Sequence, residues 1–254
     1  MVGKTRESNR FDKSFGIHQS KWDKEKKVFS QNKEDGVIEY IFDFVGTTDK
    51  YYVEFGVEKG IECNTRLLRE KHGWKGLMMD GSNSNPKINL QKEHLSPNNI
   101  VALFEKYKVP NKFDFLSVDT DMYDYFIIKE ILTKYTPRVI ILEINSALTD
   151  CSTVDIKYID TIKFWLMGTS SSGYTGASLC AMYQLLSANN YSLVYTEKRG
   201  VNAFFIHNSI LKCELYKIVG WRWFYHPPAY GNTAGHIEDG KYQFLKIEEK
   251  FFNL

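Results

Sequence analysis

Short apolar runs alternate with helix-like segments through most of this 254-residue chain, and this alternation constrains its fold more than any other feature. Strand-like runs cover residues 51–55, 75–79, 113–118 and 138–144, with a shorter run at 88–90. Helical spacing covers residues 37–45, 64–71, 98–107, 125–135 and 177–188. Strands that alternate with helices predict a parallel sheet with helices on both faces.

The last two strand-like runs, residues 191–196 and 201–207, require a different connection. Only the four residues Glu197–Gly200 separate them. Because a parallel crossover needs a dozen residues or more, these two runs must pair as an antiparallel hairpin. The sequence therefore predicts an α/β, Rossmann-like fold, with seven strands in a mostly parallel sheet and an antiparallel hairpin at one edge.

Composition and charge limit the class of protein. Hydrophobic residues make up 43% and charged residues 25%, which is typical of a globular domain and excludes a mainly disordered chain. The net charge of +2 excludes the strong field of many nucleic-acid and membrane binders. We expect an N-terminal arm (1–35), a main domain (36–213) and an aromatic C-terminal extension (214–254).

The cysteines and the N-terminal residues indicate in which cellular compartment we expect the protein. Cys63, Cys151, Cys180 and Cys213 form no C-x-x-C pair, which argues against a zinc ribbon or a redox pair. No apolar run has the length of a membrane span, and the start lacks the apolar stretch of a secretion signal. We therefore expect reduced thiols, a cytoplasmic location and no membrane partner.

The loop after the first strand is the first candidate for a ligand site, because ligands of open α/β sheets bind beyond the carboxyl ends of the strands. Gly56 and Gly60 lie four residues apart and allow close approach to the backbone, although a tight turn alone also explains them. The loop is not a G-x-G-x-x-G, and its acidic residues Glu54 and Glu58 would repel a pyrophosphate. This pattern favours a ligand with an ammonium group and hydroxyls over a nicotinamide dinucleotide.

The second strand ends at Asp80 and Gly81. Asp80 lies 24 residues after Gly56, close to the spacing at which an acidic residue binds a ribose diol. An exposed aspartate in a turn is the alternative. Together with the glycine loop, Asp80 predicts an adenosyl ligand.

Acidic residues also follow the strands 113–118 and 138–144. Asp119 and Asp121 come after the first of these strands, and Glu143 and Asn145 end the second. Crowded carboxylates need a cation, a proton or a donor nearby. One interpretation is a hard cation such as Mg²⁺, with Asp119, Glu143 and Asn145 as ligands. The other is a proton acceptor with hydrogen-bonding groups and no metal, and Asp121 can also cap the following helix.

Read together, these segments resemble the class I S-adenosylmethionine-dependent methyltransferases, and most closely the FkbM-like group. The resemblance runs from residue 30 to 207, which is 178 of the 254 residues. Its motifs are Ser30–Gly36 (S-Q-x-x-E-D-G), Tyr52–Gly56, Gly73–Gly76 leading to Asp80, Phe113–Asp121, Arg138–Asn145, Gly176–Leu179 and Gly200–Phe205. Met122 departs from the family, which usually has glycine there, and residues 150–174 match no known pattern.

The resemblance implies S-adenosyl-L-methionine as cofactor. It places Glu54, Gly56 and Gly60 around the methionine part, and Asp80 and Gly81 at the ribose. It also places Glu93 and His94 beside the adenine, and Asp119 on the sulfonium side.

The leading hypothesis is methyl transfer by in-line displacement to a hydroxyl of a small molecule or sugar. The catalytic candidates are Asp119, Asp121, Glu143 and Asn145, with His94 and His207 as fallback bases. One alternative is an RNA-directed methyltransferase that grips a strand with its aromatic C-terminus and its basic arm (Arg6, Arg10, Lys13, Lys21, Lys24, Lys26 and Lys27). A second is a non-catalytic binding module with the same fold.

Overall fold

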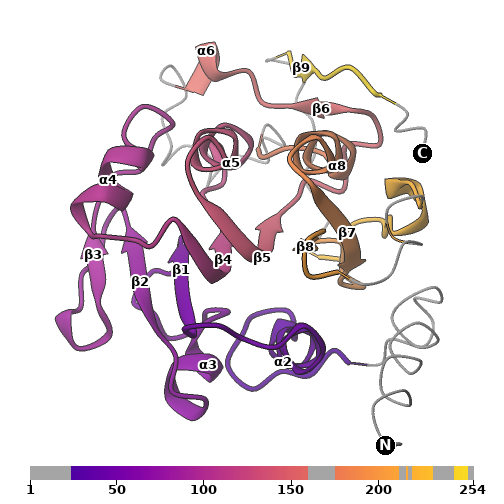
Figure 1. The fold of residues 1–254 in the computed structure, drawn as a ribbon. Coiled ribbons are helices and arrows are strands. Elements are labelled where there is room, and N and C mark those ends of the chain that lie inside the picture. The colour runs from indigo at the N-terminus through magenta and orange to yellow at the C-terminus, as the bar shows by residue number, and fades with distance from the viewer. Residues whose placement is uncertain (1–23, 160–174, 212–215, 217–218, 231–242, 251–254) are drawn as a thin grey trace, which may run out of the picture.

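A seven-stranded sheet forms the centre of the computed structural model, which describes residues 24–159, 175–211, 216, 219–230 and 243–250 (Figure 1). Its strands are β1 (Tyr51–Phe55), β2 (Lys75–Asp80), β3 (Leu90–Lys92), β4 (Lys112–Val118), β5 (Thr136–Glu143), β7 (Tyr191–Thr196) and β8 (Asn202–His207). Their spatial order is β3-β2-β1-β4-β5-β8-β7. Within this sheet β8 is antiparallel to both of its neighbours, and the other pairs are parallel.

Helices cover both faces of the sheet, as Figure 1 shows. On one side lie α4 (Ile100–Lys106), α5 (Asp124–Ile131) and α8 (Leu179–Ala188), and on the other α2 (Glu34–Val45) and α3 (Arg66–Lys71). Because both faces are covered, the central strands are buried along nearly their whole length, as in β4. The predicted Rossmann-like α/β fold with its antiparallel edge hairpin is confirmed.

The shorter elements lie at the edges of this core. They are the 3₁₀ turns η2 (Pro86–Ile88) and η3 (Trp221–Trp223), the helix α6 (Ile156–Ile159), and the strands β6 (Ser152–Thr153) and β9 (Leu245–Lys246). β6 and β9 pair with each other as a separate two-stranded sheet. Within the described ranges, none of the helices has both the length and the apolar composition that a bilayer crossing requires.

The helix α2 shows how the core is packed. Its apolar residues recur at helical spacing, and Val37, Ile41 and Phe42 are buried against the sheet. The Phe42 ring meets the rings of Trp74 and Phe115 edge to face, with centroids 4.7 and 5.7 Å away. Each fully buried side chain of this size contributes about 1.5–3 kcal/mol, so α2 is anchored firmly to the sheet.

Several element boundaries differ from the prediction by a few residues, and two of them show the local cause. The run at 88–90 is divided, because Pro86–Ile88 forms a 3₁₀ turn and the strand begins only at Leu90. The side chain of Asn85 fixes this turn by accepting a hydrogen bond from the Lys87 amide at 3.2 Å. The helix predicted over 125–135 ends at Ile131 and continues as a turn before Pro137.

The prediction of reduced thiols is wrong for Cys151 and Cys180, which form a disulfide. The fold brings them together because the chain after β5 returns onto the start of α8, where the Ser178 amide donates to the Ser152 carbonyl at 2.8 Å. Cys63 is a free, buried thiol. Cys213 lies outside the described residues, as do most of the predicted N-terminal arm and much of 150–174. The thiol argument for a cytoplasmic location therefore no longer holds.

Candidate functional site

A pocket opens at the carboxyl ends of β1 and β4, where the order of the sheet reverses. Residues from four separate parts of the chain line it: Gln31, Glu34, Glu54, Phe55, Gly56, Glu62, Cys63, Asn64, Ser117, Asp119 and Asn202. Four of these residues are acidic, and none is a lysine or arginine. The pocket wall therefore favours a ligand with positive charge.

Glu54, the last residue but one of β1, lines this pocket and is 3% exposed. Its carboxylate accepts hydrogen bonds from the backbone amides of Asn64 and Thr65, at 2.7 and 3.0 Å, and from the Thr65 hydroxyl. Burial raises the pKa of Glu54 above its ordinary value, although these hydrogen bonds oppose the rise. Glu54 thus holds the loop after β1 and presents an acidic group to the pocket.

Gly56 forms the point where the loops after β1 and β4 touch. Its φ is +67°, and a Cβ there would lie 1.8 Å from the Asp119 carbonyl oxygen. A side chain at this position is therefore excluded both by conformation and by space. Gly60 also has a positive φ, +71°, which favours glycine, whereas the atom nearest to its Cβ would be the movable Cδ1 of Ile88 at 2.6 Å.

Asp80 ties the neighbouring loops together at the end of β2. Its carboxylate accepts hydrogen bonds from the backbone amides of Glu58, Ser82 and Asn83, at 2.9, 2.8 and 2.9 Å. The backbone amide of Glu93 in turn donates to the Asp80 carbonyl at 3.0 Å. Of the residues predicted to bind the cofactor, Glu54, Gly56 and Asp119 line the pocket. Gly60, Asp80, Gly81, Glu93 and His94 do not line it but lie along the adjoining loops.

The side chains of Glu93 and His94 differ in their surroundings. Glu93 forms an ion pair with Lys106 at 2.6 Å and accepts a hydrogen bond from the Tyr107 hydroxyl, and both contacts lower its pKa. His94 is exposed. The other fallback base, His207, ends β8 opposite Tyr191. Because β8 is antiparallel, His207 lies at the edge of the sheet away from Glu143, which pairs with Asn202.

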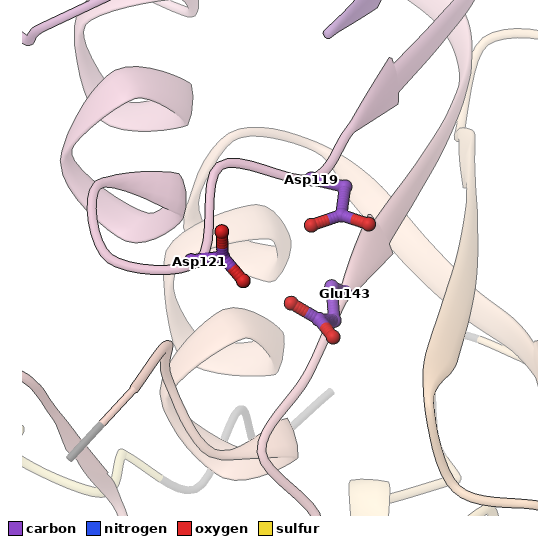
Figure 2. Close-up of side chains that lie close together, drawn as sticks. All are labelled: Asp119, Asp121 and Glu143. Carbon is purple, nitrogen blue, oxygen red and sulfur yellow. The ribbon is translucent and has the colours of Figure 1, made fainter. Parts of the chain in front are cut away.

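Three carboxyl side chains meet beside the pocket, as Figure 2 shows. Asp119 follows β4, Glu143 ends β5, and Asp121 stands on the connecting loop with a φ of +62°. One oxygen from each lies within 4.8 Å of the others. The structure therefore brings together three of the predicted catalytic residues.

Asp124 lies beneath this cluster and is fully buried. Oδ1 of Asp124 accepts hydrogen bonds from the Thr120 amide at 2.8 Å and from the Thr120 hydroxyl at 3.0 Å. Oδ2 of Asp124 has no hydrogen-bond partner among the described residues. The predicted helix cap by Asp121 is not formed, because α5 begins at Asp124 and its N-cap is Tyr123, without a side-chain hydrogen bond.

The electrostatics of the cluster favour the protonated, neutral form of its carboxyl groups. Burial raises the pKa of Asp119 to about 8, and the charges of Asp124 and Asp121 add to the rise. Burial and the charge of Asp119 raise the pKa of Glu143 well above its ordinary range, and burial raises that of Asp124 to about 6. At neutral pH the cluster therefore retains protons unless a cation replaces them.

Asn145, the fourth predicted catalytic residue, contacts its own loop. Its side-chain amide donates to the Thr175 carbonyl at 3.0 Å, and Oδ1 accepts a hydrogen bond from the Ala147 amide at 3.1 Å. Its backbone amide also donates to the Ala177 carbonyl at 2.9 Å. Asn145 thus fixes the loop after β5, while Asp121 joins Asp119 and Glu143.

Eight of the eleven lining residues were not identified from the sequence, among them Gln31, Glu34 and Asn202. Glu34 accepts a hydrogen bond from the Asn202 side chain at 2.6 Å and from the Asn32 amide at 2.7 Å. Gln31 and Glu34 lie in the motif S-Q-x-x-E-D-G, and Asn202 lies in the motif Gly200–Phe205. The signal was present, but these motifs alone did not indicate which side chains face a ligand.

The segment 219–230 of the C-terminal extension packs near the end of β5. The Tyr225 hydroxyl donates to the Ser146 carbonyl at 2.9 Å, and the Ala229 amide donates to the Arg199 carbonyl at 2.9 Å. Burial raises the pKa of Tyr230, and the charge of Glu143 adds to this rise. An aromatic residue from the extension therefore lies within electrostatic reach of the carboxylate cluster.

The strand order and the site define this chain as a Rossmann-like α/β protein with an acid-lined pocket at its topological switch point. No family model matches the chain, and no curated protein matches it. Among solved structures it is similar to phosphoethanolamine N-methyltransferase 1 of Haemonchus contortus in complex with phosphoethanolamine and S-adenosylhomocysteine, at 14% identity and a TM-score of 0.29. The match covers 74% of this chain and 43% of that one, so this chain spans less than half of its length. A TM-score this low supports no conclusion about activity, and the FkbM-like resemblance stays a prediction.

Proposed function

We propose that this protein is an S-adenosylmethionine-dependent methyltransferase that moves a methyl group to a hydroxyl of a small molecule or sugar. The main observation behind this proposal is the pocket at the ends of β1 and β4. Its lining has four acidic residues and no lysine or arginine, and the carboxylate cluster lies beside it. A sulfonium and an ammonium group suit such a wall, whereas a pyrophosphate would be repelled.

The residues present fit this cofactor. Because Gly56 has no Cβ, the loops after β1 and β4 can touch, and Glu54 and Asp119 both line the pocket there. In this proposal Glu54, Gly56 and Gly60 surround the methionine part, Asp80 and Gly81 bind the ribose, and Asp119 faces the sulfonium. Glu93 and His94 border the adenine.

When bound, the cofactor supplies an activated methyl group, so that an O–C bond forms as the C–S bond breaks and the electron pair stays on sulfur. The chain's own part is to align the acceptor hydroxyl and to take its proton. Asp119 accepts that proton in its ionised form, Asp121 and Glu143 orient the acceptor, and Asn145 holds the loop after β5 in place. A pKa of about 8 places Asp119 near the working pH, where general bases are most effective. Alignment contributes up to about 7–11 kcal/mol in favourable cases.

A divalent cation is the other way to use the same carboxylates. Asp119, Asp121 and Glu143 offer oxygen ligands of the kind that Mg²⁺ prefers, and the unpartnered Oδ2 of Asp124 adds negative charge beneath them. Asn145 was the third predicted ligand, and its Oδ1 already accepts a hydrogen bond from Ala147. A bound Mg²⁺ would supply a lowered pKa for a coordinated hydroxyl.

We further propose that the functional unit extends beyond the predicted domain 36–213. Gln31 and Glu34 line the pocket from the N-terminal side, although residues up to 35 were assigned to an arm. Tyr230 reaches the carboxylate cluster from the predicted extension. Both flanking segments therefore belong to the proposed enzyme domain.

Calorimetric titration with S-adenosylhomocysteine tests the cofactor. We expect micromolar binding by the wild-type chain, loss of binding in Asp80→Ala, and no binding of NAD. Asp43→Ala, an exposed aspartate on α2, is the matched control and should bind as the wild type does. Absence of binding to the wild-type chain would contradict the proposal.

Transfer is tested separately with labelled S-adenosylmethionine and a panel of glycosides and small alcohols. We expect a labelled methyl ether, at a rate about 10²–10⁴-fold lower in Asp119→Asn, because general-base catalysis contributes that much. Binding of the cofactor without transfer to any acceptor would favour a non-catalytic binding module.

A further inference from the structure

The segment 25–35 is fixed at the rim of the pocket by buried and half-buried carboxylates. Oδ2 of Asp35 accepts hydrogen bonds from three consecutive backbone amides, those of Val28, Phe29 and Ser30, at 2.8, 2.7 and 2.8 Å. At the start of the segment, Glu25 accepts hydrogen bonds from the Tyr195 hydroxyl at 2.6 Å and from the Lys198 amide at 2.8 Å. The segment is thereby held in one shape, so a side chain that it carries to the pocket has a defined position.

Gln31 is an exposed, pocket-lining side chain of this segment that forms no hydrogen bond with the described residues. The other amide side chains of the pocket lining already donate hydrogen bonds within the protein. Asn64 donates to the Ser117 hydroxyl at 3.1 Å, and Asn202 donates to Glu34 at 2.6 Å. Gln31 therefore supplies two free N–H donors to a wall that otherwise consists largely of acceptors.

Glu34, three residues after Gln31 in the sequence, also lines the pocket and is 1% exposed. Each of its carboxylate oxygens carries one hydrogen bond, from Asn202 to Oε1 and from the Asn32 amide to Oε2. A carboxylate oxygen accepts two hydrogen bonds, so each keeps room for another donor. The two side chains thus offer free donors and a carboxylate acceptor to the same pocket.

An α-amino acid group is the ligand chemistry that matches such a pair, because it carries a carboxylate and an ammonium on one carbon. From this arrangement we infer that Gln31 donates to the carboxylate of the cofactor's amino-acid end and that Glu34 accepts from its ammonium. The inference rests on the proposed function, since it names the residues that recognise one end of the same cofactor. Hydrogen bonds to charged groups are the stronger ones, so this end contributes much of the affinity.

The test compares two ligands by calorimetry on the full chain. S-adenosylhomocysteine has the amino-acid end, and methylthioadenosine keeps the adenosine and the sulfur but lacks it. We expect Gln31→Ala to weaken S-adenosylhomocysteine about ten- to hundred-fold, the effect of one hydrogen bond to a charged group. The affinity for methylthioadenosine should not change. Gln31→Glu should weaken S-adenosylhomocysteine further, because it brings a carboxylate against a carboxylate.

Glu34→Gln tests the ammonium contact, since it keeps an oxygen for Asn202 but loses the charge. We expect it to weaken S-adenosylhomocysteine about ten-fold or more and to leave methylthioadenosine unchanged. Retained binding of methylthioadenosine shows that the pocket is folded in this variant. The matched control is Gln91→Ala on β3, a glutamine outside the pocket lining, which should affect neither ligand.

The inference fails if Gln31→Ala binds S-adenosylhomocysteine as the wild type does, or if it weakens both ligands equally. It also fails if the wild-type chain binds the two ligands with equal affinity. If the wild-type chain binds neither ligand, the proposed function itself is wrong, and the inference is overturned with it.

Discussion

Two aspartates near the two ends of β4 lie in surroundings that shift their pKa values in opposite directions. Asp114 and Asp119 lie five residues apart, near the start of β4 and just after its end. Burial alone would raise the pKa of Asp114, but Arg138, at 2.5 Å, and the amides of Thr48 and Lys50 hold it below its ordinary value. Burial and the charges of Asp124 and Asp121 raise the pKa of Asp119 to about 8.

This difference separates a carboxylate that is paired within the fold from one whose pKa is raised. Arg138 also donates to the carbonyls of Val45 and Gly46, so Asp114 completes a network that joins β4, β5 and the end of α2. The cluster at Asp119 has no such compensation, and its cost must be met by a proton, a cation or a ligand. The four predictions that follow test this distinction.

The largest effect is expected for Asp114→Ala. The substitution leaves the Arg138 guanidinium without its partner, and breaking a buried ion pair costs about 3–5 kcal/mol. Urea denaturation should show a loss of that size in the free energy of unfolding, with Asp43→Ala as the unaffected control. A loss below about 1 kcal/mol would show that the ion pair is not structural.

Asp119→Asn should raise the free energy of unfolding, whereas Asp114→Ala lowers it. The substitution keeps the shape of the side chain and removes a charge that nothing compensates, so the free energy of unfolding at pH 8 should rise by about 1–2 kcal/mol. Circular dichroism with urea measures this change. Destabilisation comparable to that of Asp114→Ala would mean that the two carboxylates do not differ in kind.

The two aspartates also predict two limbs in the pH dependence of stability. The folded-state pKa of Asp119 lies above its unfolded value, so its stabilising contribution is present at acidic pH and is lost as the pH rises through about 8. The pKa of Asp114 is lowered, so its contribution is present above its unfolded value and is lost as the pH falls. Urea midpoints should therefore fall between pH 5 and 8.5 in the wild type, and less so in Asp119→Asn. A flat profile over this range would contradict the raised pKa.

The smallest effect is expected from Mg²⁺ at pH 8. If the cation replaces the protons of the cluster, a stabilisation of about 1 kcal/mol would raise the thermal midpoint by about 2–4 °C. Glu143→Gln should remove this shift, while Asp43→Ala should keep it. A wild-type midpoint that does not move would leave proton transfer as the role of these carboxylates.

Much of the fold could be predicted because parallel strands that are buried on both faces read as continuous apolar runs. β1 begins and ends where the run 51–55 does, and β4 and β5 differ from their runs by one or two residues at an end. The turn at Pro86–Ile88 was missed because Asn85 fixes it with one side-chain hydrogen bond, which has no periodicity. The disulfide was missed for a related reason, since only tertiary structure brings its cysteines together.

The residues of the candidate site also fall into a group that the sequence predicted and a group that it did not. Asp119, Asp121 and Glu143 follow predicted strands, so the topology alone predicted that they would meet. Gln31 and Tyr230 come from segments whose shape depends on individual contacts, such as the three amides held by Asp35 or the Tyr225 hydroxyl on Ser146. No pattern of apolar spacing marks such segments.

The link between Cys151 and Cys180 has a consequence for how this chain can diversify. Together with the hydrogen bonds of Ser178 to Ser152 and of Val154 to Gly176, the disulfide closes the base of the intervening stretch. Residues inside that closed base can be exchanged or lengthened while the cluster beside it keeps its geometry. Variation in this stretch is thereby separated from Asp119, Asp121 and Glu143, whose positions depend on β4, β5 and the loop after β4.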